Sequence, residues 1–156
     1  MEKASGFFVM NEVPDGKNLW LLATGTGLGV FISLLKTQEP WRRFENIILV
    51  HGVRNYEELT YQDQIAKFKS ENSKNFTYIQ TVTREKKEGC LNMRIPAGLD
   101  SNMIQESANL EINQDSQIMI CGNPDMINET VELLGKQGLE RNRRSKPGNI
   151  TLEKYW

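Results

Sequence analysis

The fold of this chain is decided by residues 19–30, Leu19-Trp20-Leu21-Leu22-Ala23-Thr24-Gly25-Thr26-Gly27-Leu28-Gly29-Val30. An apolar run of strand length meets a cluster of glycines, and amphipathic residues continue to Leu35, so the pattern predicts a strand, a tight turn and a helix. Glycine lets a backbone turn sharply and approach a ligand closely. The backbone N–H groups at the start of the following helix attract an anion. The stretch therefore indicates a phosphate-binding turn.

The spacing of the glycines limits which kind of phosphate site this is. Gly25 and Gly27 occupy the first two positions of the dinucleotide-binding pattern G-x-G-x-x-G, but Val30 stands at the third and Gly29 comes one residue early. No Lys-Ser or Lys-Thr pair follows, which argues against a P-loop NTPase. The alternative is a structural strand-to-helix turn that binds no ligand.

The composition of the chain fits one globular domain of ordinary kind. Its 156 residues suffice to bury a core, and the formal net charge of −1 gives no field that would favour nucleic acid or a membrane surface. No apolar run reaches the roughly 20 residues that span a bilayer, and no signal peptide opens the chain. Cys90 and Cys121 match no metal-ligand spacing, so we expect no metal site and a reduced, cytoplasmic setting.

Strand and helix patterns alternate after the glycine turn. The first helix should end before Pro40, and a helical segment from Tyr56 to Lys69 has a break or cap at Thr60-Tyr61. Apolar or alternating runs predict strands at 47–50, 76–82 and 118–120, and helical patterns occur at 103–108 and from Pro124 to Gly135. This order predicts an α/β fold: a doubly wound, mostly parallel five-stranded sheet of the Rossmann-like type.

Arginines follow two of the predicted strands. In doubly wound sheets an acidic residue after the second strand binds the ribose 2'-hydroxyl of NAD, whereas an arginine accommodates the 2'-phosphate of NADP. Arg54 stands at this place, which favours NADP. Arg84 directly follows the strand at 76–82, and Arg94 comes ten residues later; the planar guanidinium of arginine suits phosphate. The alternative for each arginine is a solvated surface charge.

Two further residues lie at the carboxyl ends of predicted strands. Cys121 precedes Gly122 and Asn123, and Asn123 is a good N-cap for the helix that starts at Pro124. Cys121 is interpreted either as a small buried apolar residue or as a residue that lines the reactive end of a cofactor site. His51 has no second histidine for a metal site, and a packed or rim histidine is favoured over a catalytic one.

Together these segments resemble a known protein family. The segments that carry the resemblance are Ala23-Thr24-Gly25-Thr26-Gly27-Leu28-Gly29, Leu49-Val50-His51-Gly52-Val53-Arg54, Thr83-Arg84-Glu85, the run from Gly89 to Pro96, Met119-Ile120-Cys121-Gly122-Asn123-Pro124-Asp125-Met126 and the final Glu153-Lys154-Tyr155-Trp156. The chain resembles, over nearly its whole length, the NADP-binding domain of the bacterial ferredoxin/flavodoxin NADP reductases. The glycine turn alone would also fit cytochrome b5 reductases and oxygenase reductase subunits.

The resemblance implies a role for particular residues. It implies that the pyrophosphate is cradled by Thr24, Gly25, Thr26 and Gly27, and that the 2'-phosphate and adenosine of NADP are held by Arg54, Arg84 and Arg94. The residues at the nicotinamide end would be Cys121, Gly122 and Asn123. The resemblance further implies that Tyr155 covers the flavin ring and that Trp156 packs toward the adenosine half of FAD. Thr26, Cys121 and Tyr155 would be the residues nearest the hydride transfer. Many relatives have proline where this chain has Val30, which leaves the start of the helix less rigid.

The resemblance also predicts what lies outside this domain. Residues 1–18 are expected to be a lead-in from a flavin-binding barrel that the chain lacks, and residues 19–156 the NADP-binding domain. We therefore expect a domain fragment that is inactive alone. In the parent protein, FAD would exchange electrons with ferredoxin or flavodoxin and a hydride with NADP. The alternatives are an NADH-preferring oxygenase-type reductase domain and a free-standing NADP-binding module.

Overall fold

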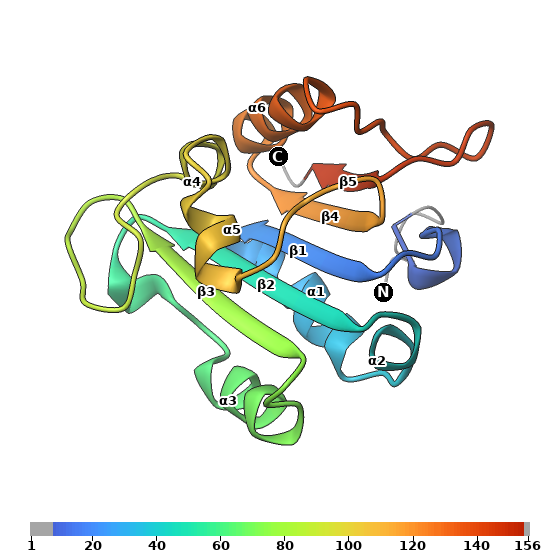
Figure 1. Ribbon diagram of the computed structural model, residues 1–156. Helices are drawn as coiled ribbons and strands as arrows, with labels where there is room; N and C mark the ends of the chain where they lie inside the picture. The colour runs from blue at the N-terminus through green and yellow to red at the C-terminus, as the bar shows by residue number, and fades with distance from the viewer. Residues whose placement is uncertain (1–7, 155–156) are drawn as a thin grey trace.

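Five parallel strands form one sheet, with helices on both of its faces (Figure 1). The computed structural model describes residues 8–154. The strands are β1 (Asn18–Thr24), β2 (Asn46–Val53), β3 (Phe76–Val82), β4 (Ser116–Gly122) and β5 (Ile150–Lys154), in the order β3-β2-β1-β4-β5. All four pairings are parallel, so the predicted doubly wound sheet is confirmed. The order reverses direction between β1 and β4, and the crevice at such a reversal is where ligands bind in these folds.

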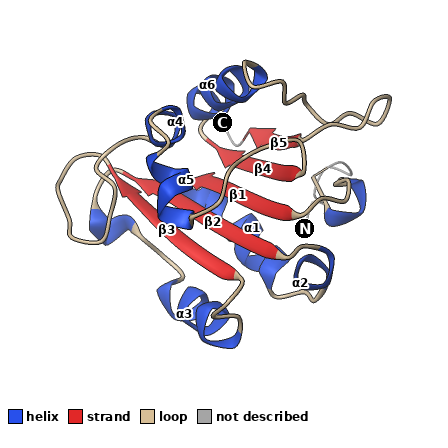
Figure 2. Cartoon of the chain, viewed as in Figure 1, coloured by secondary structure: helices blue, strands red, loops and turns tan. Residues whose placement is uncertain are grey.

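The helices divide into two layers (Figure 2). One face of the sheet carries α1 (Leu28–Leu35), α2 (Glu39–Arg43) and α3 (Gln62–Glu71). The other face carries α4 (Ile95–Asp100), α5 (Met103–Ala108) and α6 (Pro124–Gly135). Three short 3-10 turns, η1 (Met10–Glu12), η2 (Gly25–Gly27) and η3 (Tyr56–Glu58), complete the described elements.

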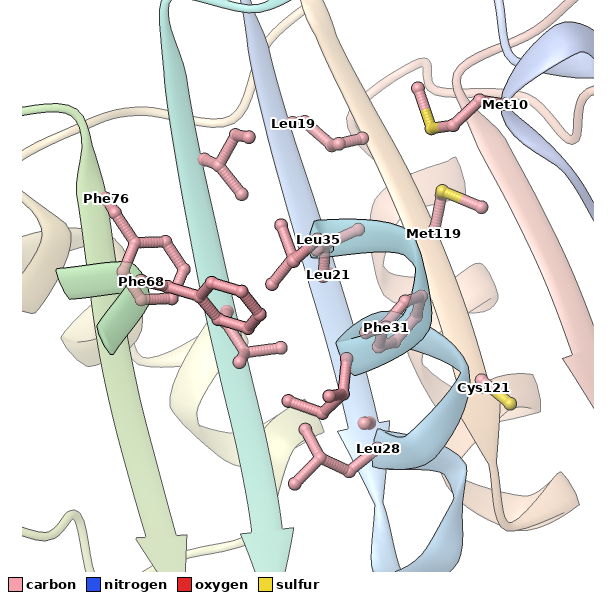
Figure 3. Close-up of a cluster of buried hydrophobic side chains, with 14 of the residues drawn as sticks. Met10, Leu19, Leu21, Leu28, Phe31, Leu35, Phe68, Phe76, Met119 and Cys121 are labelled. Atoms are coloured by element: carbon pink, nitrogen blue, oxygen red, sulfur yellow. The ribbon is translucent and has the colours of Figure 1, made fainter. Parts of the chain in front are cut away.

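The central strands are buried on both faces because alternate residues serve different cores. Leu19 and Leu21 of β1 pack in the core beneath α1, which also contains Phe31 of that helix (Figure 3). Trp20 and Leu22 point the other way, into the core beneath α4 and α6. A strand covered on both sides is apolar throughout, which is why the run at residues 19–23 has no polar alternation.

Several predicted helix boundaries agree with the structure, and one differs from it. α1 ends at Leu35 and α6 runs from Pro124 to Gly135, as predicted. Pro40 was expected only to mark the end of the first helix, but it also lies in the first turn of a second helix, α2. Proline is tolerated there because the N–H groups of the first turn have no partner within the helix. The predicted break at Thr60-Tyr61 is confirmed, because these residues separate η3 from α3.

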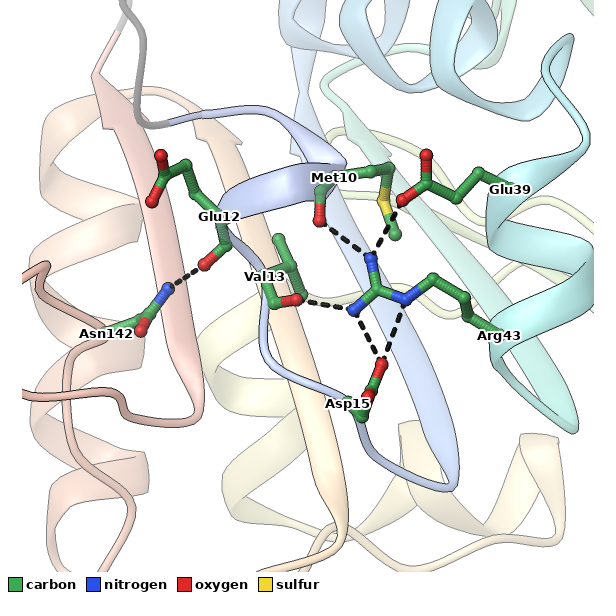
Figure 4. Close-up of polar contacts among 7 residues, drawn as sticks. All are labelled: Met10, Glu12, Val13, Asp15, Glu39, Arg43 and Asn142. Atoms are coloured by element: carbon green, nitrogen blue, oxygen red, sulfur yellow. Dashed lines mark hydrogen bonds and ion pairs between the residues drawn. The ribbon is translucent and has the colours of Figure 1, made fainter.

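The segment before β1 is held by Arg43 of α2 (Figure 4). The guanidinium donates to the carbonyl oxygen of Met10 at 2.7 Å and to that of Val13 at 2.5 Å. It also pairs with Asp15, whose Oδ1 lies 3.0 Å from Nη2. Since Met10 and Val13 are buried, the lead-in segment from residue 8 onward is part of the packed structure.

Candidate functional site

The glycine turn leaves β1 as the sequence predicts. Gly25 has φ +53, a left-handed conformation that favours glycine, and η2 then leads into α1. Gly27 is required for a different reason: a Cβ there would overlap the carbonyl oxygen of Cys121 on β4. The turn therefore lies directly against the neighbouring strand, which brings the start of α1 to the carboxyl edge of the sheet.

His51 supports this turn from β2. Its side chain is fully buried, and Nε2 lies 3.1 Å from the carbonyl oxygen of Gly25. Because a carbonyl only accepts, Nε2 carries the proton in this contact. Burial lowers the pKa of His51 below its ordinary value of 6.5, and the hydrogen bond to Gly25 opposes that change. His51 is thus a packed residue, as favoured from sequence, but its contact with the glycine turn was not predicted.

The turn after β4 is tied to the turn after β1. The backbone N–H of Asn123 donates to the hydroxyl oxygen of Thr24 at 2.9 Å. Gly122 has φ +145, and a Cβ there would overlap the same hydroxyl. Asn123 also caps α6, because its side-chain oxygen accepts from the N–H of Asp125 at 2.8 Å. The predicted cap is confirmed.

A cleft of about 720 Å³ opens at this edge of the sheet. Its wall includes Thr24, Gly25 and Thr26 of the glycine turn, the three arginines singled out from sequence, and Asn123. Cys121 and Gly122 are buried and are not part of this wall, so the structure does not bring them to the cleft surface. Tyr155 and Trp156 lie outside the described residues.

The arginines come from three different loops. Arg54 follows β2 and Arg84 follows β3, and their backbones are joined because the N–H of Arg84 donates to the carbonyl oxygen of Arg54 at 2.8 Å. Arg94 stands immediately before α4. All three side chains are exposed to solvent. The structure therefore brings together three positive charges that lie up to 40 residues apart in sequence, from 54 to 94.

Carboxylates offset part of this charge. Nη1 of Arg94 lies 2.8 and 2.9 Å from the two carboxylate oxygens of Glu129 on α6. Two acidic residues, Glu58 and Asp125, also belong to the cleft wall. Glu58 is already engaged, since its Oε1 accepts from the N–H of Asn55 at 2.8 Å. The role of Glu129 was not predicted, because nothing in the sequence pattern links two exposed charges 35 residues apart.

The described residues offer neither of two other kinds of site. No group of three or more histidine, cysteine or acidic residues in the segment 8–154 could hold a metal ion. No helix among these residues is long and apolar enough to cross a membrane. The donors that do converge are backbone N–H groups at a glycine turn and guanidinium groups, and this set suits phosphate.

Comparison with known proteins gives consistent matches. Residues 21–132 match the protein family described as oxidoreductase NAD-binding domain. The chain is 43% identical over 159 residues to a flavodoxin/ferredoxin–NADP reductase of Buchnera aphidicola, covering 99% of this chain and 61% of that protein. It is 35% identical over 158 residues to the Escherichia coli flavodoxin/ferredoxin–NADP reductase, covering 100% of this chain and 64% of that protein.

A solved structure agrees with these sequence matches. The crystal structure of a ferredoxin NADP+ reductase from Neisseria gonorrhoeae, with bound FAD and NADP, superposes with a TM-score of 0.90 at 33% identity. The superposition covers 99% of this chain and 62% of that protein. The chain thus spans between 61% and 64% of the length of these three proteins.

Proposed function

Because this chain belongs to the family of oxidoreductase NAD-binding domains, we propose that it is the NADP(H)-binding domain of a flavin-dependent ferredoxin or flavodoxin NADP reductase. The domain positions nicotinamide for hydride exchange with an FAD that is held elsewhere in the whole protein. Ferredoxin or flavodoxin is the electron-transfer partner of that protein, and the cytoplasm is its location.

One observation carries the proposal: Thr24, Gly25 and Thr26 of the glycine turn line a single cleft together with Arg54, Arg84 and Arg94. A dinucleotide with a 2'-phosphate has two separate anionic groups, the pyrophosphate and the 2'-phosphate. The cleft offers two separate sets of donors, the backbone N–H groups of the turn at Thr24, Gly25 and Thr26 and the guanidinium groups after β2 and β3. The donor set therefore fits NADP better than NAD, for which an acidic residue in place of Arg54 would be expected.

Each part of the site has its own task. The residues of the glycine turn, Thr24 to Gly27, bind the pyrophosphate, and the arginines bind the 2'-phosphate and adenosine. Thr26 lies beside the path of the hydride, and Cys121, Gly122 and Asn123 support the nicotinamide end. The nicotinamide and flavin supply the hydride chemistry when they are bound, while the protein binds and orients them. The chain alone is expected to bind nucleotide and to show no diaphorase activity when FAD is added.

The test is a calorimetric titration of this chain with 2'-phospho-AMP and, in parallel, with AMP. We expect binding of 2'-phospho-AMP to be at least about tenfold tighter, because a charge-assisted hydrogen bond contributes on the order of 1.5 to 3 kcal/mol. Arg54→Ala and Arg84→Ala should each reduce this difference. Arg42→Ala is the matched control, since Arg42 lies on α2 and is not part of the cleft wall.

Equal affinity for the two ligands would contradict the assignment of NADP. It would favour the NADH-preferring oxygenase-type reductase, in which the arginines are surface charges. If Arg42→Ala reduced the preference as much as Arg54→Ala, general positive charge rather than the cleft would explain the binding.

A further inference from the structure

Tyr61 is an unusual residue in the wall of the cleft. It stands between η3 and α3 with φ 58 and ψ 25, in the left-handed region. Among the described residues, the other non-glycine residues with positive φ are Asn102 and Asn109, and asparagine tolerates this conformation. Tyrosine does not favour it. The sequence predicted a break or cap here, but no role in the site.

The ring of Tyr61 is presented to the cleft. Tyr61 is 42% exposed, although large apolar rings are usually covered, and it belongs to the cleft wall together with Gly25 and Arg54. The hydroxyl makes no hydrogen bond within residues 8–154. A phenolic O–H can both donate and accept, so this group is available to a ligand.

The hydroxyl of Tyr61 lies close to Gly29 in the first turn of α1. A Cβ at Gly29 would lie 3.4 Å from the hydroxyl oxygen of Tyr61 and 4.0 Å from its Cζ. The tyrosine thus reaches from the residue before α3 toward the start of α1. Both distances are those of an ordinary van der Waals contact, so the tyrosine lies directly beside the first turn of α1.

The order of the strands places this hydroxyl relative to the other donors. Arg84 follows β3, Arg54 follows the neighbouring β2, and the glycine turn follows β1, so the donors run along one edge of the sheet. Tyr61 reaches the β1 end of this row, where α1 begins. If the 2'-phosphate of a nucleotide contacts Arg54 and Arg84, its pyrophosphate would lie near the hydroxyl of Tyr61.

We infer that the hydroxyl of Tyr61 donates a hydrogen bond to the pyrophosphate of the nucleotide that binds over the glycine turn. The inference rests on the proposed function, because it requires a dinucleotide in this cleft. It adds a second binding residue, after Arg54, from the segment that joins β2 to α3.

The experiment compares two ligands on the whole chain, NADP and adenosine 2'-monophosphate. The second ligand has the 2'-phosphate but no pyrophosphate. Tyr61→Phe removes only the hydroxyl, so it should weaken NADP binding about tenfold and leave the affinity for adenosine 2'-monophosphate unchanged. Tyr56→Phe is the matched control, because Tyr56 is similarly exposed at 38% but does not line the cleft.

A second variant tests the role of Gly29. In Gly29→Ala the added methyl group would lie 3.4 Å from the hydroxyl oxygen of Tyr61, an ordinary van der Waals contact that covers one side of the hydroxyl without displacing it, so NADP binding should weaken only slightly in the wild-type background. In the Tyr61→Phe background the same change should have little further effect, because the hydroxyl is already gone. Thermal unfolding of each variant separates a loss of binding from a loss of folding.

The possible results distinguish this inference from the proposed function. If the wild-type chain binds both ligands and Tyr61→Phe leaves NADP affinity unchanged, the inference is wrong and the proposed function stands. Equal loss for both ligands would also overturn it, since the hydroxyl would then act on the adenosine half. If the wild-type chain binds neither ligand, both proposals fail.

Discussion

The hydroxyl oxygen of Thr24 accepts a hydrogen bond from the backbone N–H of Asn123, with 2.9 Å between the two atoms. The bond joins the end of β1 to the start of α6, across 99 residues of sequence. Both residues belong to the cleft wall, so this bond holds the two central loops of the site together. It lies at the point where the strand order reverses, which is where such a sheet binds its ligand.

Removing this hydroxyl should destabilise the chain. Thr24→Val keeps the shape of the side chain but leaves the N–H of Asn123 without an acceptor, at a cost of about 1 to 2 kcal/mol in the free energy of unfolding. Thr24→Ser retains the hydroxyl and should lose less. Urea denaturation of the two variants measures the difference, and equal stability of Val and Ser would show that the bond contributes nothing.

Close packing of the glycine turn gives a second prediction. Gly27→Ala would place a methyl group on the carbonyl oxygen of Cys121, and because backbone on both sides must move, we expect a loss of about 1 to 3 kcal/mol. Gly135→Ala is the control, since nothing lies within 4 Å of a Cβ at the end of α6. It should be neutral or stabilising by up to about 1 kcal/mol. Thermal unfolding of both variants is the measurement. If Gly27→Ala is no less stable than Gly135→Ala, the close packing of residue 27 against β4 does not contribute to stability.

The sequence predicted the fold well because its signals are local. The apolar run of β1, the glycine turn and the cap at Asn123 with Pro124 in the first turn of α6 each act within a few residues, and each is confirmed. α2 was missed because Pro40 was interpreted only as a terminator, although proline also begins helices.

The site was predicted in part. Arg54 and Arg84 were assigned correctly to one edge because they follow parallel strands, whose carboxyl ends meet there. Three contacts had no sequence signal: Glu129 on Arg94, His51 on Gly25, and Tyr61 over the first turn of α1. Each brings a side chain against another element of the fold, so only the packed chain defines it.

The ion pair of Arg94 predicts how one carboxylate affects the nucleotide. Both oxygens of Glu129 contact Nη1 of Arg94, so a 2'-phosphate that binds this guanidinium competes with them. The two side chains are 50% and 46% exposed, and such a pair contributes no more than about 1 kcal/mol. Glu129→Gln should therefore tighten binding of 2'-phospho-AMP by up to about fivefold and leave AMP unaffected.

The control for this change lies on the same helix. Glu132 is exposed on α6 and forms no ion pair among residues 8–154, so Glu132→Gln removes the same charge without freeing Arg94. Calorimetry in low and moderate salt compares the two variants. Weaker binding by Glu129→Gln would mean that Glu129 orients Arg94 instead of competing for it.

The buried imidazole of His51 makes stability depend on pH. Burial lowers the pKa of His51 below its ordinary value of 6.5, so below that pH the unfolded chain binds a proton that the folded chain does not. The free energy of unfolding should therefore fall as the pH decreases from 7.5 to 5.5. His51→Gln can still donate to the carbonyl oxygen of Gly25 but does not titrate, so its stability should change less over this range. Urea denaturation at both pH values tests this, and parallel decreases for the two proteins would show that His51 is not the group responsible.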